Sequence, residues 1–339
     1  MHAMVDGLRV SYTDEGQGIP LLLVHGFPLD RGVWQNQVDA FKHSYRVIAP
    51  DLRGFGESKA STGAVSMSCF AKDLYGLLQH LGCGPVILVG HSMGGYVALA
   101  FAKAYPKLLR GLVLVGTKAG ADAPEVAAAR RSTAEKVRAH GCSLVVDAMA
   151  PKMLAPGNTD LAMAAAVRGF MSTATTEGVI GALQGMAERP DAAQWLGLTR
   201  VPTLVVVGAE DSIIPPGESE ALARVIPGAQ LKVIPHAGHL VAFEQPDAFN
   251  SVLKDWLGWG STLKTVVKFD EGSKTMPPDR PNAPRVADWP NGGLAPSWAQ
   301  PILRAAAWMV QRRDSPTVKP LQPGSQATTD LPRLNNESR

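Results

Sequence analysis

The stretch Gly90-His91-Ser92-Met93-Gly94-Gly95 decides how this chain folds. An apolar run, residues 85–90, precedes it and a run with helical character, residues 96–105, follows it, so we expect a strand, one sharp turn and a helix. A serine flanked by glycines in that context is typical of a nucleophile elbow, where small neighbours leave room for a strained turn. The free N–H groups at the start of the helix would favour negative charge beside Ser92. The motif alone also fits an ordinary glycine-rich turn, so the rest of the chain has to decide.

Apolar strands and helical segments alternate on both sides of this stretch. That alternation predicts βαβ units and a mostly parallel sheet. Residues 7–16 alternate in polarity and end in glycine, as in an antiparallel edge hairpin. The other expected strands are residues 20–26, 45–50, 110–116, 201–208 and 229–234, and the other expected helices are residues 32–42, 67–81, 218–225 and 246–257.

The alternation stops after the sixth strand. Between residues 118 and 198 alanine, methionine, arginine and glutamate dominate, and we expect about four helices and no strand. An all-helical insertion into a parallel sheet predicts a lid over the strand ends, where ligands of α/β proteins bind. Ordinary crossover helices are the alternative. The predicted domains are a core of residues 1–117 and 199–260, a helical lid of residues 118–198, and a tail of residues 261–339.

The tail differs in composition from the rest of the chain. It holds 11 of the 26 prolines and carries eleven lysine and arginine residues against seven acidic ones. A polar, proline-rich segment buries too little apolar surface to offset its ordering entropy, so we expect it to be largely disordered. Residues 300–313 could form a short helix that docks on the core, or a basic helix on a membrane surface.

The overall composition excludes several classes of protein. Of 339 residues, 45% are hydrophobic and 19% charged, and no apolar run reaches the roughly 18 residues of a membrane span. The first residues lack the basic and apolar parts of a signal peptide, so we expect a cytoplasmic protein without stable membrane insertion. The basic excess belongs to the tail and gives no reason to expect a nucleic-acid partner. Cys69, Cys83 and Cys142 are widely spaced, which favours buried free thiols over disulfides or zinc.

Candidate partners for Ser92 follow the last two strands. A serine hydroxyl needs a base to take its proton, and histidine with an orienting carboxylate is suited to that task. In a parallel sheet these groups must stand at the carboxyl ends of strands. Glu210 and Asp211 follow one late strand, and His236 and His239 follow the next. The chain order serine, acid, histidine is the order expected for an elbow on this kind of sheet.

The sequence resembles the α/β-hydrolase superfamily, among its cytoplasmic, lid-bearing esterases and enol-lactonases. The resemblance covers about residues 4–259 and has no counterpart for the tail. It depends on five motifs in order, which are His25-Gly26-Phe27-Pro28, Asp51-x-Arg53-Gly54-x-Gly56-x-Ser58, the elbow, Gly208-x-x-Asp211, and Gly238-His239 with Glu244-x-Pro246 downstream.

The resemblance implies a role for each member of the candidate triad. Ser92 would be the nucleophile, His239 the general base and acid, and Asp211 the orienting carboxylate. His236 competes with His239, but it stands at the strand end, whereas Gly238-His239 provides a loop from which the ring can reach back. Glu210 competes with Asp211, and so does Asp122, because some relatives place the acid after the earlier strand. Asp51 and Arg53 are expected to brace loops rather than react.

The resemblance also implies an oxyanion hole formed by the N–H groups of Phe27 and Met93. Pro28 fits this expectation, because it biases Phe27 toward an extended backbone and has no N–H of its own. A turn that merely ends the strand is the alternative for His25-Gly26. Neither a metal nor an organic cofactor is expected. Candidates for an apolar acyl pocket in the lid are Met149, Met153, Met163, Met171, Met186, Phe170 and Trp195, although packing within the lid is their ordinary role.

These observations predict a serine hydrolase that cleaves carboxylic esters of short to medium acyl chain through an acyl-enzyme. A lactonase of the enol-lactone type or a cofactor-free perhydrolase would share the motif set, and a ligand-binding receptor on the same fold is a further alternative. Haloalkane dehalogenases and epoxide hydrolases are disfavoured, because such relatives carry an aspartate where this chain has Ser92. The expected partner is a small-molecule ester or lactone.

Overall fold

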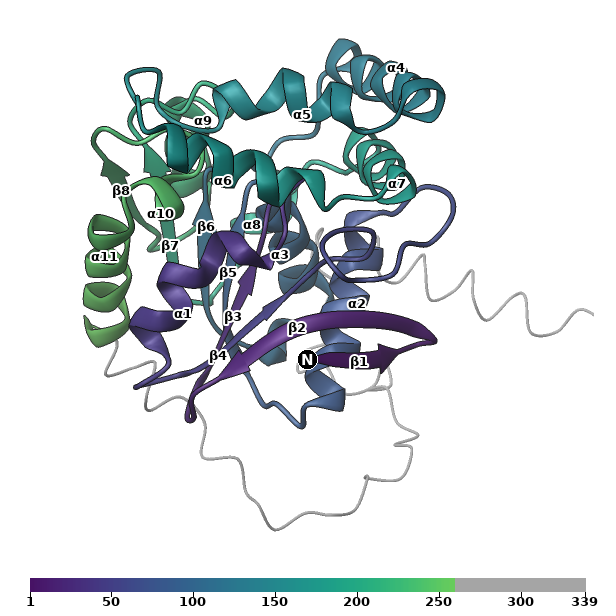
Figure 1. The fold of residues 1–339 in the computed structure, drawn as a ribbon. Coiled ribbons are helices and arrows are strands. Elements are labelled where there is room, and N and C mark those ends of the chain that lie inside the picture. The colour runs from purple at the N-terminus through teal and green to yellow at the C-terminus, as the bar shows by residue number, and fades with distance from the viewer. Residues whose placement is uncertain (260–339) are drawn as a thin grey trace, which may run out of the picture. The chain divides into compact units, whose positions relative to one another are not determined.

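An eight-stranded sheet forms the centre of the molecule in the computed structural model, which describes residues 1–259 (Figure 1). Its strand order is β1-β2-β4-β3-β5-β6-β7-β8. The strands β3 to β8 pair in parallel, whereas β1 and β2 are antiparallel at one edge. The strands are β1 (His2–Val5), β2 (Leu8–Glu15), β3 (Pro20–Val24), β4 (Arg46–Pro50), β5 (Val86–His91), β6 (Leu109–Val115), β7 (Thr203–Gly208) and β8 (Gln230–Ile234). The mostly parallel sheet is confirmed, and the predicted tail lies outside the described residues.

Each central strand contributes to two hydrophobic cores. Successive side chains of a strand point to opposite faces, so Leu22 and its neighbour Leu88 pack in one core, whereas Leu21 and Ile87 pack in the other. Helices α2 (Met67–His80) and α3 (Met93–Ala104) cover the first face, and α1 (Gln35–Phe41) and α11 (Pro246–Trp259) cover the second (Figure 1). Coverage of both faces explains why the central strands read as continuous apolar runs.

The edge of the sheet departs from the sequence prediction. Residues 7–16 are one strand, β2, rather than a complete hairpin. The hairpin partner is β1, and the turn between them is Asp6-Gly7, where both residues have positive φ values of 48° and 79°. The polarity pattern identified an antiparallel edge correctly, but the short N-terminal strand carried too few residues to show a pattern. Cys83 is buried as expected, whereas Cys69 and Cys142 are half-buried, and all three thiols are unpaired.

A helical insertion, residues 118–198, separates β6 from β7 and contains no strand. Figure 1 shows its longer helices gathered at one end of the sheet. Its helices are α4 (Pro124–His140), α5 (Ser143–Met149), α6 (Leu161–Ser172), α7 (Thr176–Ala187) and α8 (Ala193–Leu196), with the 3-10 turn η3 (Ala150–Lys152). The remaining helices of the core are η1 (Arg31–Trp34), η2 (Pro106–Leu108), α9 (Pro216–Val225) and α10 (Val241–Glu244). No helix within residues 1–259 has both the length and the apolarity to cross a membrane.

The helical insertion contacts loops that follow the carboxyl ends of strands. Beyond β8, the Leu240 N–H donates to the carbonyl of Met153 at 2.9 Å. Beyond β4, the N–H and the hydroxyl of Thr175 both donate to the carbonyl of Gly54, at 2.9 and 3.0 Å. A Cβ atom on Gly178 would lie 2.2 Å from the same carbonyl oxygen, so α7 meets this loop backbone to backbone. The insertion therefore lies over the edge of the sheet where parallel α/β proteins bind ligands.

Two glycines in the helical insertion provide a matched test of this packing. A Cβ atom on Gly185 of α7 would lie 1.8 Å from the carbonyl oxygen of Val65, whereas one on Gly169 of α6 would meet nothing within 4 Å. Gly185→Ala should lower the free energy of unfolding by about 1–3 kcal/mol, because backbone must move to admit the methyl group. Gly169→Ala should be neutral or stabilise by up to about 1 kcal/mol, since alanine is the better helix former. Urea denaturation of both variants measures the difference, and equal effects would contradict the described contact between α7 and residue 65.

Candidate functional site

Ser92 occupies a strained turn between β5 and α3. Its φ of 53° and ψ of −115° are unusual for a residue with a side chain. The turn is possible because its neighbours are glycines: a Cβ on Gly94 would lie 2.4 Å from the carbonyl oxygen of Val24, and one on Gly90 would lie 2.4 Å from that of Gly94. The Ser92 N–H donates to Val115 O at 2.8 Å. These contacts keep the serine at the carboxyl edge of the central strands, in a conformation typical of a nucleophile elbow.

The structure brings the predicted triad residues into one hydrogen-bonded chain. His239 Nδ1 lies 2.8 Å from Asp211 Oδ2, and His239 Nε2 lies 2.9 Å from Ser92 Oγ. Because a carboxylate oxygen can only accept, the proton is on Nδ1, and Nε2 is left to accept from the serine hydroxyl. The side chains of Asp211 and His239 are 0% and 1% exposed, so water does not compete for the bond between them.

Two backbone groups hold the Asp211 carboxylate in place. Its Oδ1 accepts hydrogen bonds from the N–H groups of Ile213 and Ile214, both at 2.9 Å. The other oxygen, Oδ2, remains for His239. This division of the two oxygens orients the carboxylate toward the imidazole ring.

The alternative residues are engaged elsewhere. His236 and Glu210 are exposed and lie 3.7 Å apart, Nδ1 to Oε1, whereas the histidine bonded to Ser92 Oγ is His239. Asp122 forms ion pairs with Arg130 at 2.6 Å and with Arg189 at 2.9 Å. Burial by itself would raise the pKa of Asp122, but the hydrogen bonds and charges of the two guanidinium groups outweigh it and lower that pKa. Asp122 is therefore part of a buried ionic cluster in the helical insertion.

The predicted oxyanion residues lie on either side of Ser92. Met93 is the first residue of α3, so its N–H is among those that a helix leaves without an intrahelical partner. Phe27 follows β3 in a loop that contacts the elbow directly, because a Cβ on Gly26 would lie 3.0 Å from Ser92 Cβ. The Leu29 N–H donates to Gly26 O at 3.0 Å and tightens this loop. The Phe27–Pro28 peptide bond is cis.

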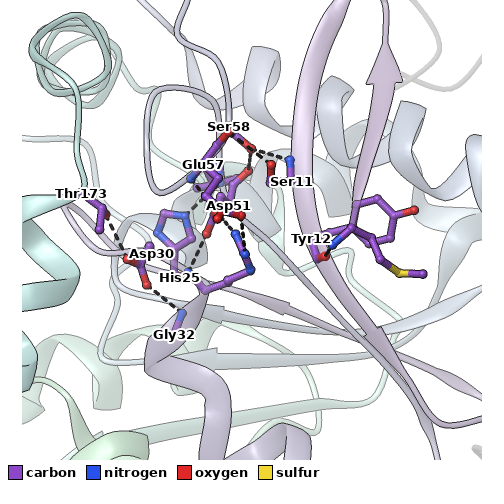
Figure 2. A network of polar contacts seen from close by, with 12 residues as sticks. Ser11, Tyr12, His25, Asp30, Gly32, Asp51, Glu57, Ser58 and Thr173 are labelled. Atoms are coloured by element: carbon purple, nitrogen blue, oxygen red, sulfur yellow. Dashed lines mark hydrogen bonds and ion pairs between the residues drawn. The ribbon is translucent and has the colours of Figure 1, made fainter.

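A buried polar network fixes the loop that carries Phe27. His25 Nδ1 donates to the carbonyl of Gly26 at 2.8 Å, and His25 Nε2 accepts from the Leu52 N–H at 2.9 Å, so the ring is neutral with its proton on Nδ1. Burial lowers the pKa of His25, which is consistent with this neutral form. Figure 2 shows the neighbouring Asp51 carboxylate at the centre of the network, where it accepts from the N–H groups of Arg31 at 2.8 Å and Glu57 at 2.9 Å.

The glycine-punctuated loop after β4 braces the same region. Ser58 Oγ donates to the carbonyl of Asp51 at 2.8 Å (Figure 2). Arg53 pairs with Asp73 on α2, Nε to Oδ2, at 2.6 Å. A Cβ on Gly56 would lie 2.3 Å from the Asp51 carboxylate, which explains the glycine. Neither Asp51 nor Arg53 contacts the triad, in agreement with the bracing role expected for them.

One buried carboxylate, Glu244, was quoted in a motif but not recognised as part of the site. It accepts from the Gly238 N–H at 2.6 Å, from Asn158 Nδ2 at 2.7 Å and from the Ala155 N–H at 2.9 Å. It thus joins the loop that carries His239 to the helical insertion. The sequence feature that could have indicated its role is its position shortly after Gly238-His239, in the same motif.

The acyl-pocket candidates do not form one group. Met153, Met171, Met163 and Phe170 pack with the core on the α1 and α11 face, whereas Met186 and Trp195 pack with the core on the α2 and α3 face, and Met149 contacts both. Trp195 lines a cavity of about 490 Å³ beside Tyr96, Lys103 and Arg189. No triad residue lines that cavity.

A family model described as the alpha/beta hydrolase fold matches residues 19–246, more than half of the chain. The chain belongs to this family. The central sheet, the flanking helices and the elbow of this alpha/beta hydrolase agree with the resemblance seen in its motifs.

Solved structures and curated sequences include relatives of this alpha/beta hydrolase. A thermophilic esterase from Thermogutta terrifontis is 43% identical, with a TM-score of 0.74 over 76% of this chain and 98% of that one. The enol-lactonase from Burkholderia xenovorans LB400 is 27% identical, with a TM-score of 0.70 over 76% of this chain and all of the other. The 2-hydroxymuconate semialdehyde hydrolase of Pseudomonas putida is 31% identical over 273 residues, which cover 76% of this chain and 93% of the relative.

Replacing Glu244 should expose its role in joining the two loops. Glu244→Gln puts an amide N–H where several N–H donors converge, so we expect the free energy of unfolding to fall by about 2–4 kcal/mol. Glu177→Gln, at an exposed site in the first turn of α7, should change it by less than about 0.5 kcal/mol. Urea denaturation compares the two variants, and a Glu244 variant as stable as the Glu177 variant would contradict this assignment.

The two buried histidines next to the elbow should make stability depend on pH. Burial, and then the neighbouring His239 ring, lowers the pKa of His91 from 6.5 to about 3. The unfolded chain therefore binds more protons than the folded one between these values, so this contribution is complete above pH 6.5 and is lost as the pH falls toward 3.

The His91→Gln variant has no titratable group at this position. Between about pH 7 and about pH 4.5 its free energy of unfolding should therefore fall by roughly 2.5 kcal/mol less than that of the wild type. His25 has a lowered pKa in both proteins, so its contribution cancels. Urea denaturation at the two pH values measures the difference, and parallel losses in the two proteins would show that folded His91 titrates normally.

Proposed function

We propose that this alpha/beta hydrolase is a serine hydrolase that cleaves carboxylic esters of short to medium acyl chain. The observation that carries the proposal is the chain of hydrogen bonds from Asp211 through His239 to Ser92 Oγ, with distances of 2.8 and 2.9 Å. A small-molecule ester as the substrate and a cytoplasmic location are part of the proposal.

The geometry supports a two-step reaction through an acyl-enzyme. Ser92 Oγ attacks the ester carbonyl while His239 Nε2 takes its proton, and Asp211 stabilises the imidazolium that forms. The tetrahedral intermediate collapses as His239 gives that proton to the leaving alcohol. A water then gives its proton to His239 and attacks the acyl-enzyme, and the proton returns to Ser92 as the acid leaves.

The oxyanion would be bound by the N–H groups of Phe27 and Met93. Their positions on the loop after β3 and at the start of α3 fit that role, because Gly26 brings the loop into contact with Ser92. One such donor typically contributes about 3 kcal/mol to the transition state.

The comparisons support an ester more than the alternatives. The esterase from T. terrifontis is the relative with 43% identity over nearly its whole length. The likeness to an enol-lactonase favours lactones as a second candidate, because a lactone is a cyclic ester that the same steps would open. A perhydrolase and a ligand-binding receptor are the remaining alternatives, and no contact described among residues 1–259 favours either of them.

Hydrolysis of p-nitrophenyl esters of graded chain length tests the proposal. Ser92→Ala should lower kcat by about a thousandfold or more, since the nucleophile is lost. Ser172→Ala, at an exposed position in α6, should keep the wild-type rate. The chain-length profile of the wild type reports the size of the acyl site, and equal rates for wild type and Ser92→Ala would exclude Ser92 as the nucleophile.

A lactone panel assayed beside the esters separates the two candidates. A kcat/KM for enol-lactones well above that for every linear ester would favour the lactonase. If neither class reacts, 2-hydroxymuconate semialdehyde is the next compound to assay, because the P. putida relative is named as its hydrolase. Binding of esters without turnover would favour the receptor.

A further inference from the structure

The backbone around His239 is held at three successive residues. The Gly238 N–H is bound by Glu244, and the Leu240 N–H by the carbonyl of Met153. Between them, the carbonyl of His239 lies 2.9 Å from Nε2 of His91, the residue before Ser92. The two imidazole rings are 4.8 Å apart, centroid to centroid, and both residues are buried. His91 thus links the strand that carries Ser92 to the loop that carries His239.

The bond to the His239 carbonyl determines which nitrogen of His91 carries the proton. A carbonyl oxygen only accepts, so the proton is on Nε2, and a neutral ring then has an unprotonated Nδ1. Among residues 1–259, His91 Nδ1 and the indole Nε1 of Trp34 are buried and have no hydrogen-bond partner. One is an acceptor and the other a donor. Buried polar atoms normally find partners, in protein or in water.

A small void, open on one side, is lined by both residues. It measures about 10 Å³ and is lined by Trp34 and His91 together with the apolar side chains of Val33, Leu240, Ala242 and Phe243. That volume is close to the smallest that holds one water molecule. The rings of Trp34 and His91 stand edge to face with centroids 6.5 Å apart. The residue with the unpaired donor and the residue with the unpaired acceptor therefore line the same void.

We propose that one buried water in this void accepts from Trp34 Nε1–H and donates to His91 Nδ1, and that His91 so oriented is a positioning residue for His239. The role in positioning rests on the proposed function, in which His239 is the base. The water site itself depends only on the void and on the unpaired polar atoms of two residues that line it.

The water would stabilise the one tautomer of His91 that can bind the His239 carbonyl. In the other tautomer a lone pair on Nε2 would face the carbonyl oxygen and repel it. Without the bond, His239 would lose a hydrogen bond to the last residue of β5, and the distance between Nε2 and Ser92 Oγ would vary. Reaction rates are sensitive to such displacements. A neutral His91 also avoids a second positive charge beside the imidazolium that forms on His239.

Crystallography at high resolution tests the water directly. We expect one density peak within hydrogen-bond distance of both Trp34 Nε1 and His91 Nδ1. Nitrogen-15 spectra of histidine-labelled protein should assign His91 as a neutral ring protonated at Nε2. An empty void, or a proton on Nδ1, would overturn the water site.

Kinetics of variants test the positioning role. His91→Gln keeps an N–H donor the same number of bonds from the backbone, whereas His91→Phe keeps a ring and removes the donor. We expect His91→Phe to lower kcat for p-nitrophenyl acetate about tenfold or more with little change in KM, and His91→Gln to stay within about threefold of the wild type. The rate at which a fluorophosphonate inactivates the enzyme should change in parallel. A Gln variant as slow as the Phe variant, or a loss confined to KM, would overturn the role.

A matched pair of tryptophan variants tests the Trp34 side of the proposed water bridge between Trp34 and His91. Trp34→Phe removes the donor to the water and should slow inactivation by about threefold, whereas Trp256→Phe, at a buried tryptophan of α11 that does not line the void, should not. If His91→Phe does not fold, the comparison of these two tryptophan variants decides instead, and equal rates would count against the bridge. A wild type inert to esters and to the fluorophosphonate would overturn the proposed function and the positioning role together. The density and the nitrogen-15 spectra would still decide the water site.

Discussion

The backbone of Ser92 is kept at a φ of 53°, and much of the molecule is arranged so that it can remain there. Strained conformations persist only where their surroundings leave no alternative. The surroundings here are backbone atoms brought close by glycines: Gly94 against the carbonyl of Val24, and Gly26 against the serine itself. Both contacts require that β3 and β5 lie side by side in parallel, with Val24 opposite Gly90. The pairing of these two strands is therefore the constraint on which the site depends.

Three buried carboxylates accept hydrogen bonds from backbone N–H groups in the loops near the paired strands β3 and β5. Loops at the carboxyl edge of the sheet have N–H groups that no strand satisfies. Asp51 binds such groups near the ends of β3 and β4, Asp211 binds them after β7, and Glu244 binds one after β8. Asp211 differs from the other two because one of its oxygens is free of backbone donors and turns to His239. A buried carboxylate thus stabilises the loop in all three cases, and in the loop after β7 it also binds His239.

Local patterns in the chain were enough to predict the order of most strands and helices and the insertion after the sixth strand. They also pointed to Asp211 and His239, which the structure links by hydrogen bonds to Ser92. Each of these features is encoded within about ten neighbouring residues, by apolar runs, helical spacing and glycines. The hairpin partner of β2 has only four residues and shows no pattern. Glu244 and His91 were missed because their partners, Ala155 and His239, are distant in sequence, so the contacts exist only in the folded chain. The candidate pocket residues failed to group for the same reason, since their helical spacing does not say which core they enter.

The meeting of Gly54 and Gly178 bears on how such an insertion can be exchanged between relatives. Thr175 and Gly178 contact the carbonyl of Gly54 so closely that a side chain at either glycine would clash with the opposite backbone. The helical insertion is therefore not a self-contained module with a free underside. A chimera that imports a foreign insertion must therefore import the matching loop after β4 as well. Recombination breakpoints placed only in the loops that flank residues 118–198 would separate two backbones that are packed against each other.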